Sequence, residues 1–447
     1  MENRKAGDPA LGGNGATVTD TSTIALAVLL VSLVTWAPLP CHAQPQQPAP
    51  TRPAAAAIFE QTLAEQGLDA AKARLREVMA DTTGAYTIDP YELLRGLPMR
   101  LKQQGKKAEA LALIELLGEF FGDSPRYWPE LGNAYLLAGN REQATRALKK
   151  AVEMDSTQAE IAWMLDHMDQ IMANVKLQLA AEGKYTPGQN TGLQGPYLGQ
   201  TPPGRLPEVF APGIVNTTDN EYSISFSPDG REIYFSRGGT GTLVCRWTEE
   251  GWTAPEVLYL IDEQHVTEEA NVAPNGRRIF FCGRRGLRDE REIYVAERAG
   301  HGWGTPTKLF PGMYATATLG NVLYYTEVTG RPDYGVIVRR LPTENGYGEP
   351  EVIPGNVNSE GPDAHPFIAP DESFLLFDTY RQPGAGLYIC FRRADGSWGE
   401  IIPLDDRLGI PPVGQAALSP DGKYLFFSLC GDMYWVDARF LAELNAR

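Results

Sequence analysis

The sequence is poor in histidine and cysteine, with five residues of each in 447. So few histidines leave little material for a histidine-dependent enzyme, and no Gly-x-Ser-x-Gly, His-Glu-x-x-His or phosphate-loop motif occurs. Positive charge is also scarce, because 40 lysines and arginines oppose 56 aspartates and glutamates, which gives a net charge of −16. An acidic chain is repelled by phosphate backbones, so the composition argues against nucleic-acid binding.

Long apolar runs are rare, and residues 24–34 form the clearest one. This run is shorter than the roughly 20 apolar residues that cross a bilayer. Pro38 and Pro40 end it, and small residues follow at 41–43, which is typical of a cleavable export signal. We therefore predict a signal peptide over residues 1–43 and a mature chain without a transmembrane segment. A lipidated Cys41 and an uncleaved anchor are the alternatives.

Abundant turn formers are what the sequence does have, with 46 glycines, 34 prolines and 10% aromatic residues. This composition favours a large β component. Glutamine, proline and alanine fill residues 44–54, and glycine and proline without apolar periodicity fill 179–204. Both stretches are predicted to be linkers. They divide the chain into two predicted domains, 55–178 and 205–447.

Residues 55–178 carry apolar side chains at helical spacing, with short breaks at glycine, aspartate or proline. The clearest unit resembles the tetratricopeptide repeat, and a second copy lies 34 residues earlier; the residues that carry the resemblance are Trp128, Leu131, Gly132, Tyr135, Gly139, Ala144, Leu148 and Ala151. We expect a short α-solenoid capped by a final helix, Gln158–Leu177. Its groove either takes a peptide or serves as a rigid spacer.

Residues 205–447 repeat a four-strand phrase with a Ser-Pro-Asp-Gly-like turn. The turn positions are Gly230, Gly276, Gly320, Glu372 and Gly422, spaced 46, 44, 52 and 50 apart. Five such units predict a five-bladed β-propeller. The fifth unit lacks its outer strand, and the lone segment Leu206–Phe210 is expected to supply it beside Tyr434–Val436. The predicted fold is thus multidomain: a tetratricopeptide α-solenoid followed by an all-β, five-bladed propeller that an N-terminal strand closes.

The propeller turns, followed by Tyr-Phe-Ser and an arginine at 237, 284 and 381, resemble the TolB-like, WD-like propeller repeat. The combination of signal, helical repeats and propeller is similar to bacterial envelope scaffold proteins. This resemblance implies a non-enzymatic, exported protein, periplasmic or associated with the outer membrane, which binds envelope proteins or peptides. It implies no cofactor and no metal. The alternative is a carbohydrate-active, glycosidase-like or sugar-sensing propeller, with a glycan as its partner.

Acidic residues gather where the inner strands of the propeller are expected to begin. The candidate ligand-binding residues at this channel mouth are Glu221, Glu268, Glu269, Glu360, Asp363 and His365. Glycosidases use two carboxylates about 5–10 Å apart, so these residues are candidates for such a pair across the channel. A polar funnel that binds a peptide, sugar or cation, and a solvated rim, are the alternatives.

A dense charged loop in the second unit is the other candidate site. Its arginines are Arg284, Arg285, Arg288 and Arg291, and the interpretations are a self-paired hairpin or a docking patch. The propeller cysteines follow neither a disulfide framework nor a Cys-x-x-Cys metal pattern; they are Cys245, Cys282, Cys390 and Cys430. We expect buried thiols, with one disulfide between neighbouring blades as the alternative.

Overall fold

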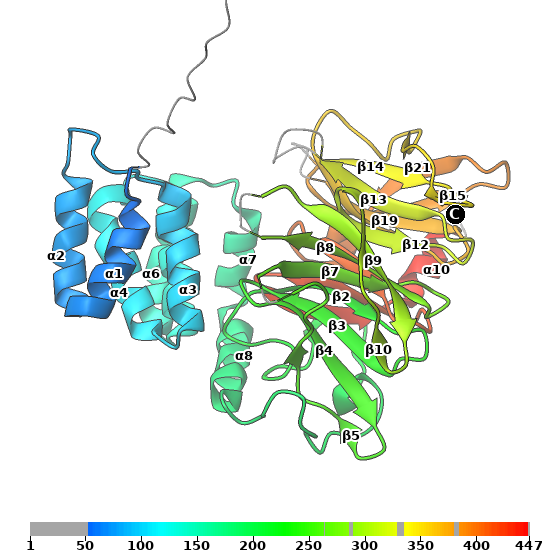
Figure 1. Cartoon of the computed structure of the whole chain (residues 1–447), viewed down its shortest axis with the longest axis horizontal. Helices are drawn as coiled ribbons and strands as arrows, with labels where there is room; N and C mark the ends of the chain where they lie inside the picture. Colours follow the sequence, from blue (N-terminus) through cyan, green and yellow to red (C-terminus); the bar gives the residue numbers. More distant parts are fainter. Residues whose placement is uncertain (1–51, 263, 286–288, 329–334, 380–383, 446–447) are drawn as a thin grey trace, which may run out of the picture. The chain divides into compact units, whose positions relative to one another are not determined.

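The computed structural model describes residues 52–445, apart from 263, 286–288, 329–334 and 380–383. The predicted export signal and most of the linker after it lie outside the described residues. Of the helices that the structure describes, none is both long and apolar enough to span a membrane. The described chain is α-helical first and then a β-propeller, as the sequence predicts (Figure 1).

The helical part consists mainly of antiparallel pairs. The helices are α1 (Ala55–Gln66), α2 (Leu68–Met79), α3 (Leu97–Gln103), α4 (Lys107–Phe121), α5 (Tyr127–Leu137), α6 (Arg141–Met154), α7 (Ala159–Asp166) and α8 (Met168–Ala181), with a π-helical turn at Glu92–Gly96. The expected single helix over 158–177 is two helices, because His167 leaves the helical conformation between α7 and α8. Its ring stacks on Trp163 at a centroid distance of 4.2 Å.

The α5–α6 pair shows why this sequence forms a tight hairpin. A Cβ atom added at Gly132 would lie 2.4 Å from Cδ2 of Leu148, so the two helices approach at a distance that only glycine allows. Ala144 and Ala147 are also buried in α6. Asn140 caps α6 by accepting a hydrogen bond from the backbone N–H of Gln143. Small residues at the contact therefore set the geometry that the sequence pattern predicts.

Five sheets make up the propeller (Figure 1). The first is β2 (Glu221–Phe226), β3 (Glu232–Arg237), β4 (Gly241–Thr248), β5 (Gly251–Trp252) and β6 (Glu256–Val257); the second is β7 (Val266–Val272), β8 (Arg278–Arg284), β9 (Glu292–Ala299), β10 (Gly302–Trp303) and β11 (Thr307–Pro311). The third is β12 (Met313–Ala317), β13 (Leu323–Val328), β14 (Gly335–Arg340) and β17 (Glu351–Val352); the fourth is β18 (Asp363–Ile368), β19 (Phe374–Thr379), β20 (Gly386–Arg392) and β21 (Trp398–Pro403). The fifth is β22 (Gly414–Leu418), β23 (Tyr424–Leu429), β24 (Asp432–Asp437) and β1 (Glu208–Val209).

Shorter elements connect these sheets. They are the 3₁₀ turn Tyr197–Gly199, the hairpin of β15 (Pro342–Thr343) and β16 (Gly346–Tyr347), α9 (Asp405–Leu408) and α10 (Arg439–Asn445).

The ring closes as the sequence predicts. β1 pairs antiparallel with β24, with Glu208 opposite Trp435 and Val209 opposite Tyr434. The inner strands contact one another in the cyclic order β2, β7, β12, β18, β22 and back to β2. A strand from before the first sheet thus completes the last one, which satisfies an edge that would otherwise stay unpaired.

The hairpin between the first two strands of each sheet turns at a residue with positive φ. Gly230, Gly276 and Gly422 have φ values of 68°, 71° and 69°, and Glu372 adopts 60° without being glycine. In the third sheet the residue is Asn321, at 60°, and not the neighbouring Gly320 that the spacing indicated. Asparagine tolerates the left-handed region, so this turn keeps the same geometry with a different residue.

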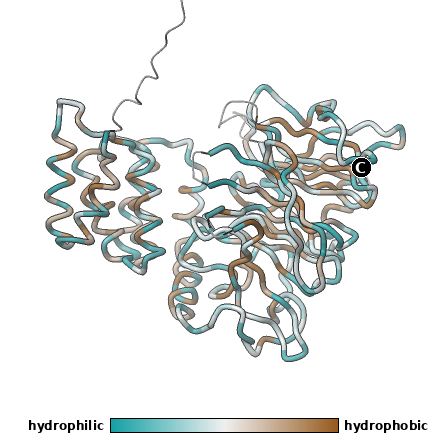
Figure 2. Tube along the Cα trace, in the orientation of Figure 1, coloured by the Kyte–Doolittle hydropathy of each residue, from teal (hydrophilic) through white to brown (hydrophobic). Residues whose placement is uncertain are grey.

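Buried aliphatic and aromatic side chains of the strands form the cores between sheets, and hydrophobic residues follow the strands in Figure 2. The four cysteines of the propeller are free thiols: Cys245, Cys282 and Cys390 are buried, and Cys430 is half-buried. The alternative of a disulfide between blades is therefore not realised.

Candidate functional site: a polar cluster in the propeller channel

Every inner strand is interrupted by a bulge at the same place. The register against the second strand shifts between Tyr222 and Ser225, and at the equivalent step in β7, β12, β18 and β22. The first bulged residue of each strand has a φ between 50° and 58°; these residues are Ser223, Glu269, Tyr314, His365 and Gln415. We call these five the inward positions. Positive φ is costly for residues other than glycine, and such strain clusters at functional sites.

The side chains at three inward positions meet across the channel. Nε2 of His365 lies 3.8 Å from Oε1 of Glu269, although the two residues belong to the fourth and second sheets. Nε2 of Gln415, from the fifth sheet, lies 3.5 Å from the same Oε1 and 3.4 Å from Nε2 of His365. The side chains of His365 and Glu269 keep 8% and 5% exposure, so they are nearly desolvated and still reach solvent.

His365 is oriented by a carboxylate on the neighbouring strand. Its Nδ1 lies 2.9 Å from both oxygens of Asp378 in β19. Asp378 is 2% exposed, and its Oδ1 also accepts a hydrogen bond of 3.0 Å from the backbone N–H of Gln415. The acceptor at Nδ1 places the proton there in neutral imidazole and leaves Nε2 for chemistry in the channel.

Tyr314 ties Glu269 into the same cluster. Oε2 of Glu269 accepts a hydrogen bond of 2.9 Å from the backbone N–H of Tyr314, and Oε1 is left facing His365. The phenol of Tyr314 crosses to the fifth sheet and donates to the carbonyl of Ala416 at 3.1 Å. We call Glu269, Tyr314, His365, Asp378 and Gln415 the channel cluster.

The surroundings shift both acid–base groups of this cluster. Burial raises the pKa of Glu269, although the charges of His365 and Arg291 oppose that shift. Burial alone lowers the pKa of His365, but the carboxylates of Asp378 and Glu269 together outweigh it, and the resulting pKa lies above the ordinary value. The positive charge of His365 favours the ionised carboxyl, and the negative charge of Glu269 favours the protonated imidazole. Such a pair can remove one proton and deliver another.

Arg291, from the predicted charged loop, contributes positive charge at this site. Its Nη1 lies 3.7 Å from Sδ of Met313, the first residue of the inner strand β12. Its charge lowers the pKa of both Glu269 and His365. Among the predicted loop arginines that the structure describes, Arg291 is thus the one whose charge acts on the channel cluster.

The other loop arginines lie elsewhere. Arg284 pairs with Glu268 at 2.9 Å, and Nε of Arg285 lies 3.2 Å from Nε2 of His265. Arg288 lies outside the described residues.

Three predicted carboxylates of the channel mouth are occupied by structural contacts. Glu221 is fully buried, pairs with Nε of Arg237 at 2.6 Å and accepts a hydrogen bond from the backbone N–H of Thr217. Glu268 accepts a hydrogen bond from the hydroxyl of Tyr222 at 2.6 Å. The carboxylate of Asp363 accepts from the hydroxyl of Ser359 at 2.8 Å. Glu360 is exposed. Of the six predicted residues, the structure brings Glu269 and His365 together.

Sequence reasoning missed Ser223, Tyr314, Asp378 and Gln415, although the repeat itself marks the inward positions. Each inward position lies seven residues before the positive-φ turn residue, as 223 does before 230 and 365 before 372. Asp378 likewise occupies the second-strand position of Ser236, Cys282 and Ser428, opposite the residue before the bulge. Aligning the five repeats on their turns would have placed these residues on one ring.

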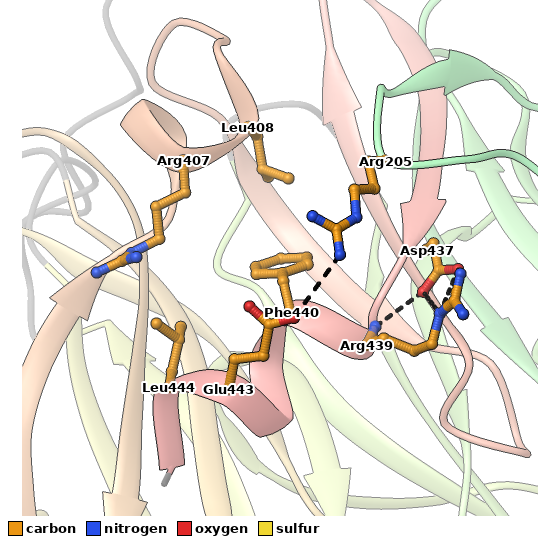
Figure 3. A pocket seen from close by; sticks show the side chains of 8 residues that line it. All are labelled: Arg205, Arg407, Leu408, Asp437, Arg439, Phe440, Glu443 and Leu444. Atoms are coloured by element: carbon orange, nitrogen blue, oxygen red, sulfur yellow. Dashed lines mark hydrogen bonds and ion pairs between the residues drawn. The ribbon is translucent and has the colours of Figure 1, made fainter. Parts of the chain in front are cut away.

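A cavity of about 390 Å³ lies beside α9 and α10 (Figure 3). Arg205, Arg407 and Arg439 line it, but Arg439 pairs with Asp437 at 2.5 Å and Arg205 lies 3.9 Å from Glu443. These two arginines are highly exposed, with side-chain exposures of 90% for Arg205 and 83% for Arg439. The channel cluster holds its groups in a far more desolvated setting. We find no group of three or more histidines, cysteines, aspartates or glutamates suited to a metal ion among the described residues.

Comparisons with known proteins yield structures only. No protein-family model and no curated protein matches the chain. Among solved structures, a gluconolactonase from Xanthomonas campestris is 13% identical with a TM-score of 0.32, over 48% of this chain and 85% of that one. A prolyl endopeptidase is 15% identical with a TM-score of 0.30, and the match covers 46% of this chain and 30% of that one. A putative 6-phosphogluconolactonase from Bacteroides fragilis is 15% identical with a TM-score of 0.28, over 44% and 60% of the two chains.

These similar structures are enzymes, and they overturn the sequence-based prediction of a non-enzymatic scaffold. The physical reason for the error lies in the fold. That prediction depended on the resemblance to envelope scaffold proteins and on the lack of a contiguous catalytic motif, whereas a propeller assembles its channel from one residue on each of five distant strands. The chemistry proposed below is drawn from the side chains of the channel and not from these neighbours.

Proposed function

We propose that the protein is a hydrolase with its active centre in the channel cluster, and that it cleaves an ester bond in a sugar-type substrate, such as a sugar lactone. The observation that carries this proposal is the contact between Glu269 and His365, 3.8 Å apart and nearly desolvated, with Asp378 behind the imidazole at 2.9 Å. A carboxylate base and an imidazolium acid held this way meet the needs of hydrolysis.

The residues suffice for both proton transfers. Oε1 of Glu269 takes a proton from the attacking water while the water oxygen bonds to the ester carbon. As the bond to the leaving oxygen breaks, Nε2 of His365 gives that oxygen its proton. Glu269 is then protonated and His365 neutral, and the proton returns across the 3.8 Å that separates them. The products are an acid and an alcohol, which are a single hydroxy acid when the substrate is a lactone.

The short distance favours an ester over a glycoside. In inverting glycosidases the acid and the base act on opposite faces of the sugar, about 6.5–9.5 Å apart, and in retaining enzymes the two carboxyls are about 5–5.5 Å apart. Glu269 and His365 are closer than either arrangement. Attack on a planar carbonyl places the incoming and leaving oxygens on one tetrahedral carbon, so neighbouring groups can serve both. The amide of Gln415 and the Glu269 carboxylate suit a substrate with hydroxyl groups.

The test compares channel variants with matched controls. Purified protein is assayed against aldonolactones by acid release and against nitrophenyl esters and glycosides by absorbance. Glu269→Gln and His365→Gln should each lower kcat by roughly 10²–10⁴-fold, the usual contribution of a general acid or base. The controls are Glu297→Gln and His301→Gln, both at exposed positions. Ester hydrolysis that survives in both channel variants, or its absence in the wild type, would overturn the proposal.

We also propose that this enzyme is exported and that its helical part is of the tetratricopeptide type. The apolar run at 24–34 supports export, and the small-residue contact of Gly132 with Leu148 supports the repeat type. The turn phrases support a TolB-like propeller. Fractionation of cells that produce the full chain tests export, since recovery of the protein in the cytoplasmic fraction would contradict it.

A further inference from the structure

The five inward positions are not equally filled. Four of them carry the long side chains of Glu269, Tyr314, His365 and Gln415, each of which makes polar contacts across the channel. The fifth, in the first sheet, is Ser223, whose side chain is the shortest of the five. The bulge of β2 gives Ser223 the same φ, 54°, as the other inward residues. Its side chain therefore starts from the same backbone geometry as theirs.

The hydroxyl of Ser223 is buried without a partner. The residue is 1% exposed, and its Oγ has no hydrogen-bond partner in the part of the chain that the structure describes. Ser225, two residues along the same strand, is also buried, but its Oγ donates to the carbonyl of Ala270. An unmade hydrogen bond at a buried hydroxyl costs about 1–3 kcal/mol, so such a group calls for an explanation.

The ring places Ser223 on the strand between those that carry Glu269 and Gln415. β2 contacts β7 on one side and β22 on the other, and these strands carry Glu269 and Gln415. Gln415 and Glu269 approach each other at 3.5 Å, so the residues that flank Ser223 converge on Oε1 of Glu269.

We propose that Ser223 binds the substrate in the channel, where its hydroxyl donates a hydrogen bond to the ester carbonyl oxygen. This inference rests on the proposed function. A donor at that oxygen stabilises the negative charge that develops when water adds, in the manner of an oxyanion hole. Ser223 is not placed as a nucleophile, because its Oγ has no hydrogen bond to His365.

Two substitutions distinguish the effect of losing the Ser223 hydroxyl from the effect of a larger side chain at this position. Ser223→Ala removes the donor and keeps the room, so kcat on aldonolactones should fall by roughly 10²–10³-fold, as at other oxyanion donors. Ser223→Gln fills the position, so the protein should lose both hydrolysis and binding of gluconate. Binding is measured as the rise in Tm that gluconate causes in the Glu269→Gln background. The matched control is Ser225→Ala, which should lower Tm through its lost bond to Ala270 and leave kcat unchanged.

The outcomes distinguish the two proposals. If Glu269→Gln and His365→Gln lose hydrolysis while Ser223→Ala and Ser223→Gln keep wild-type kcat and gluconate binding, the assignment of Ser223 is wrong and the proposed function stands. If no channel variant changes hydrolysis, the proposed function is wrong. A covalent acyl group found on Ser223 by mass spectrometry after rapid quenching would overturn the donor role in favour of a nucleophile. Equal losses in Ser225→Ala would overturn the assignment as well.

Discussion

Nδ1 of His365 lies 2.9 Å from Oδ1 of Asp378, on neighbouring strands of the fourth sheet. The two residues stand one step apart in register, because Asp378 is opposite Ala364. In the other four sheets the position of Asp378 holds Ser236, Cys282, Thr326 and Ser428. The repeat thus provides the same position in every sheet. Only the fourth of these five sheets has a carboxylate at this position, and there it lies beside an imidazole.

The pH dependence of hydrolysis should follow from this pair. The active form needs Glu269 ionised and His365 protonated, so activity should rise through the raised pKa of the carboxyl and fall through the raised pKa of the imidazole. Because Asp378 raises the pKa of His365, Asp378→Asn should move the alkaline limb of the kcat profile to lower pH. We expect the rate to fall by about 10-fold or more while KM changes little, since Asp378 acts through His365.

A stopped-assay series from pH 4 to 10 measures both limbs in wild type and Asp378→Asn. The side chain keeps its shape, so circular dichroism should be unchanged. A purely structural role would lower Tm and the overall rate but leave the two limbs in place, and that result would contradict the prediction.

Arg291 should influence the acid limb. Its charge lowers the pKa of Glu269, so Arg291→Gln should let this pKa rise and move the acid limb to higher pH. The same change removes a charge that lowers the pKa of His365, and the alkaline limb should move upward with it. Arg285→Gln is the control, since Arg285 is exposed and contacts His265. An upward shift in the control variant, or its absence in Arg291→Gln, would refute the placement of Arg291 at the channel.

Asp405 should make stability fall as the pH rises from about 4 to about 7. Burial raises the pKa of Asp405 to about 7, although the backbone N–H of Leu387 donates to its carboxylate at 2.9 Å. The folded state therefore binds the proton more tightly than the unfolded state, whose pKa is near 4. The stability that this group contributes is fully present below about pH 4 and is lost as the pH rises to about 7, by at most about 4 kcal/mol.

Asp405→Asn keeps an oxygen for the Leu387 bond and removes the charge. It should match wild type at pH 4 and exceed it in urea unfolding at pH 8. Asp406→Asn, at the adjacent exposed position, is the control. Equal pH slopes in wild type and Asp405→Asn would show that this carboxyl does not titrate as described.

The sequence predicts the fold of this protein better than its candidate site. Turn chemistry and alternation repeat every 44 to 52 residues, so local signals suffice for five sheets and for the missing outer strand. Glu269 and His365 were found because they are charged and lie near strand starts. The contact between Glu269 and His365 was not predicted, because it depends on which side of each bulge a residue faces. Nothing in the residue types of Tyr314, Gln415 and Ser223 marks them as site residues. They stand out only when the five strands of the ring bring the inward positions together.

The same contrast shows at Glu221 and Asp363, which are acidic and near the channel. Glu221 pairs with Arg237, its cross-strand partner in β3, and also accepts a hydrogen bond from Thr217, while Asp363 accepts one from Ser359. Thr217 and Ser359 lie in loops whose course the sequence pattern does not specify.

Closure of the ring should depend on Phe210, which follows β1. Phe210 is fully buried, its ring lies 5.1 Å from the rings of both Phe426 and Trp435, and its N–H donates to the carbonyl of Met433 at 2.8 Å. Phe210→Ala should therefore reduce the free energy of unfolding by about 3–5 kcal/mol, as for other buried aromatic residues. Leu206→Ala is the control, because Leu206 is 76% exposed and should change stability by less than about 0.5 kcal/mol.

Urea unfolding followed by tryptophan fluorescence measures both variants, and Trp435 reports directly on the closing sheet. Hydrogen exchange shows where the structure opens. The amides of β24 and β23 should lose protection first in Phe210→Ala, because the edge of the fifth sheet opens there. If the inner strands of the second and third sheets lost protection equally early, the segment before the first sheet would not be what holds the ring together.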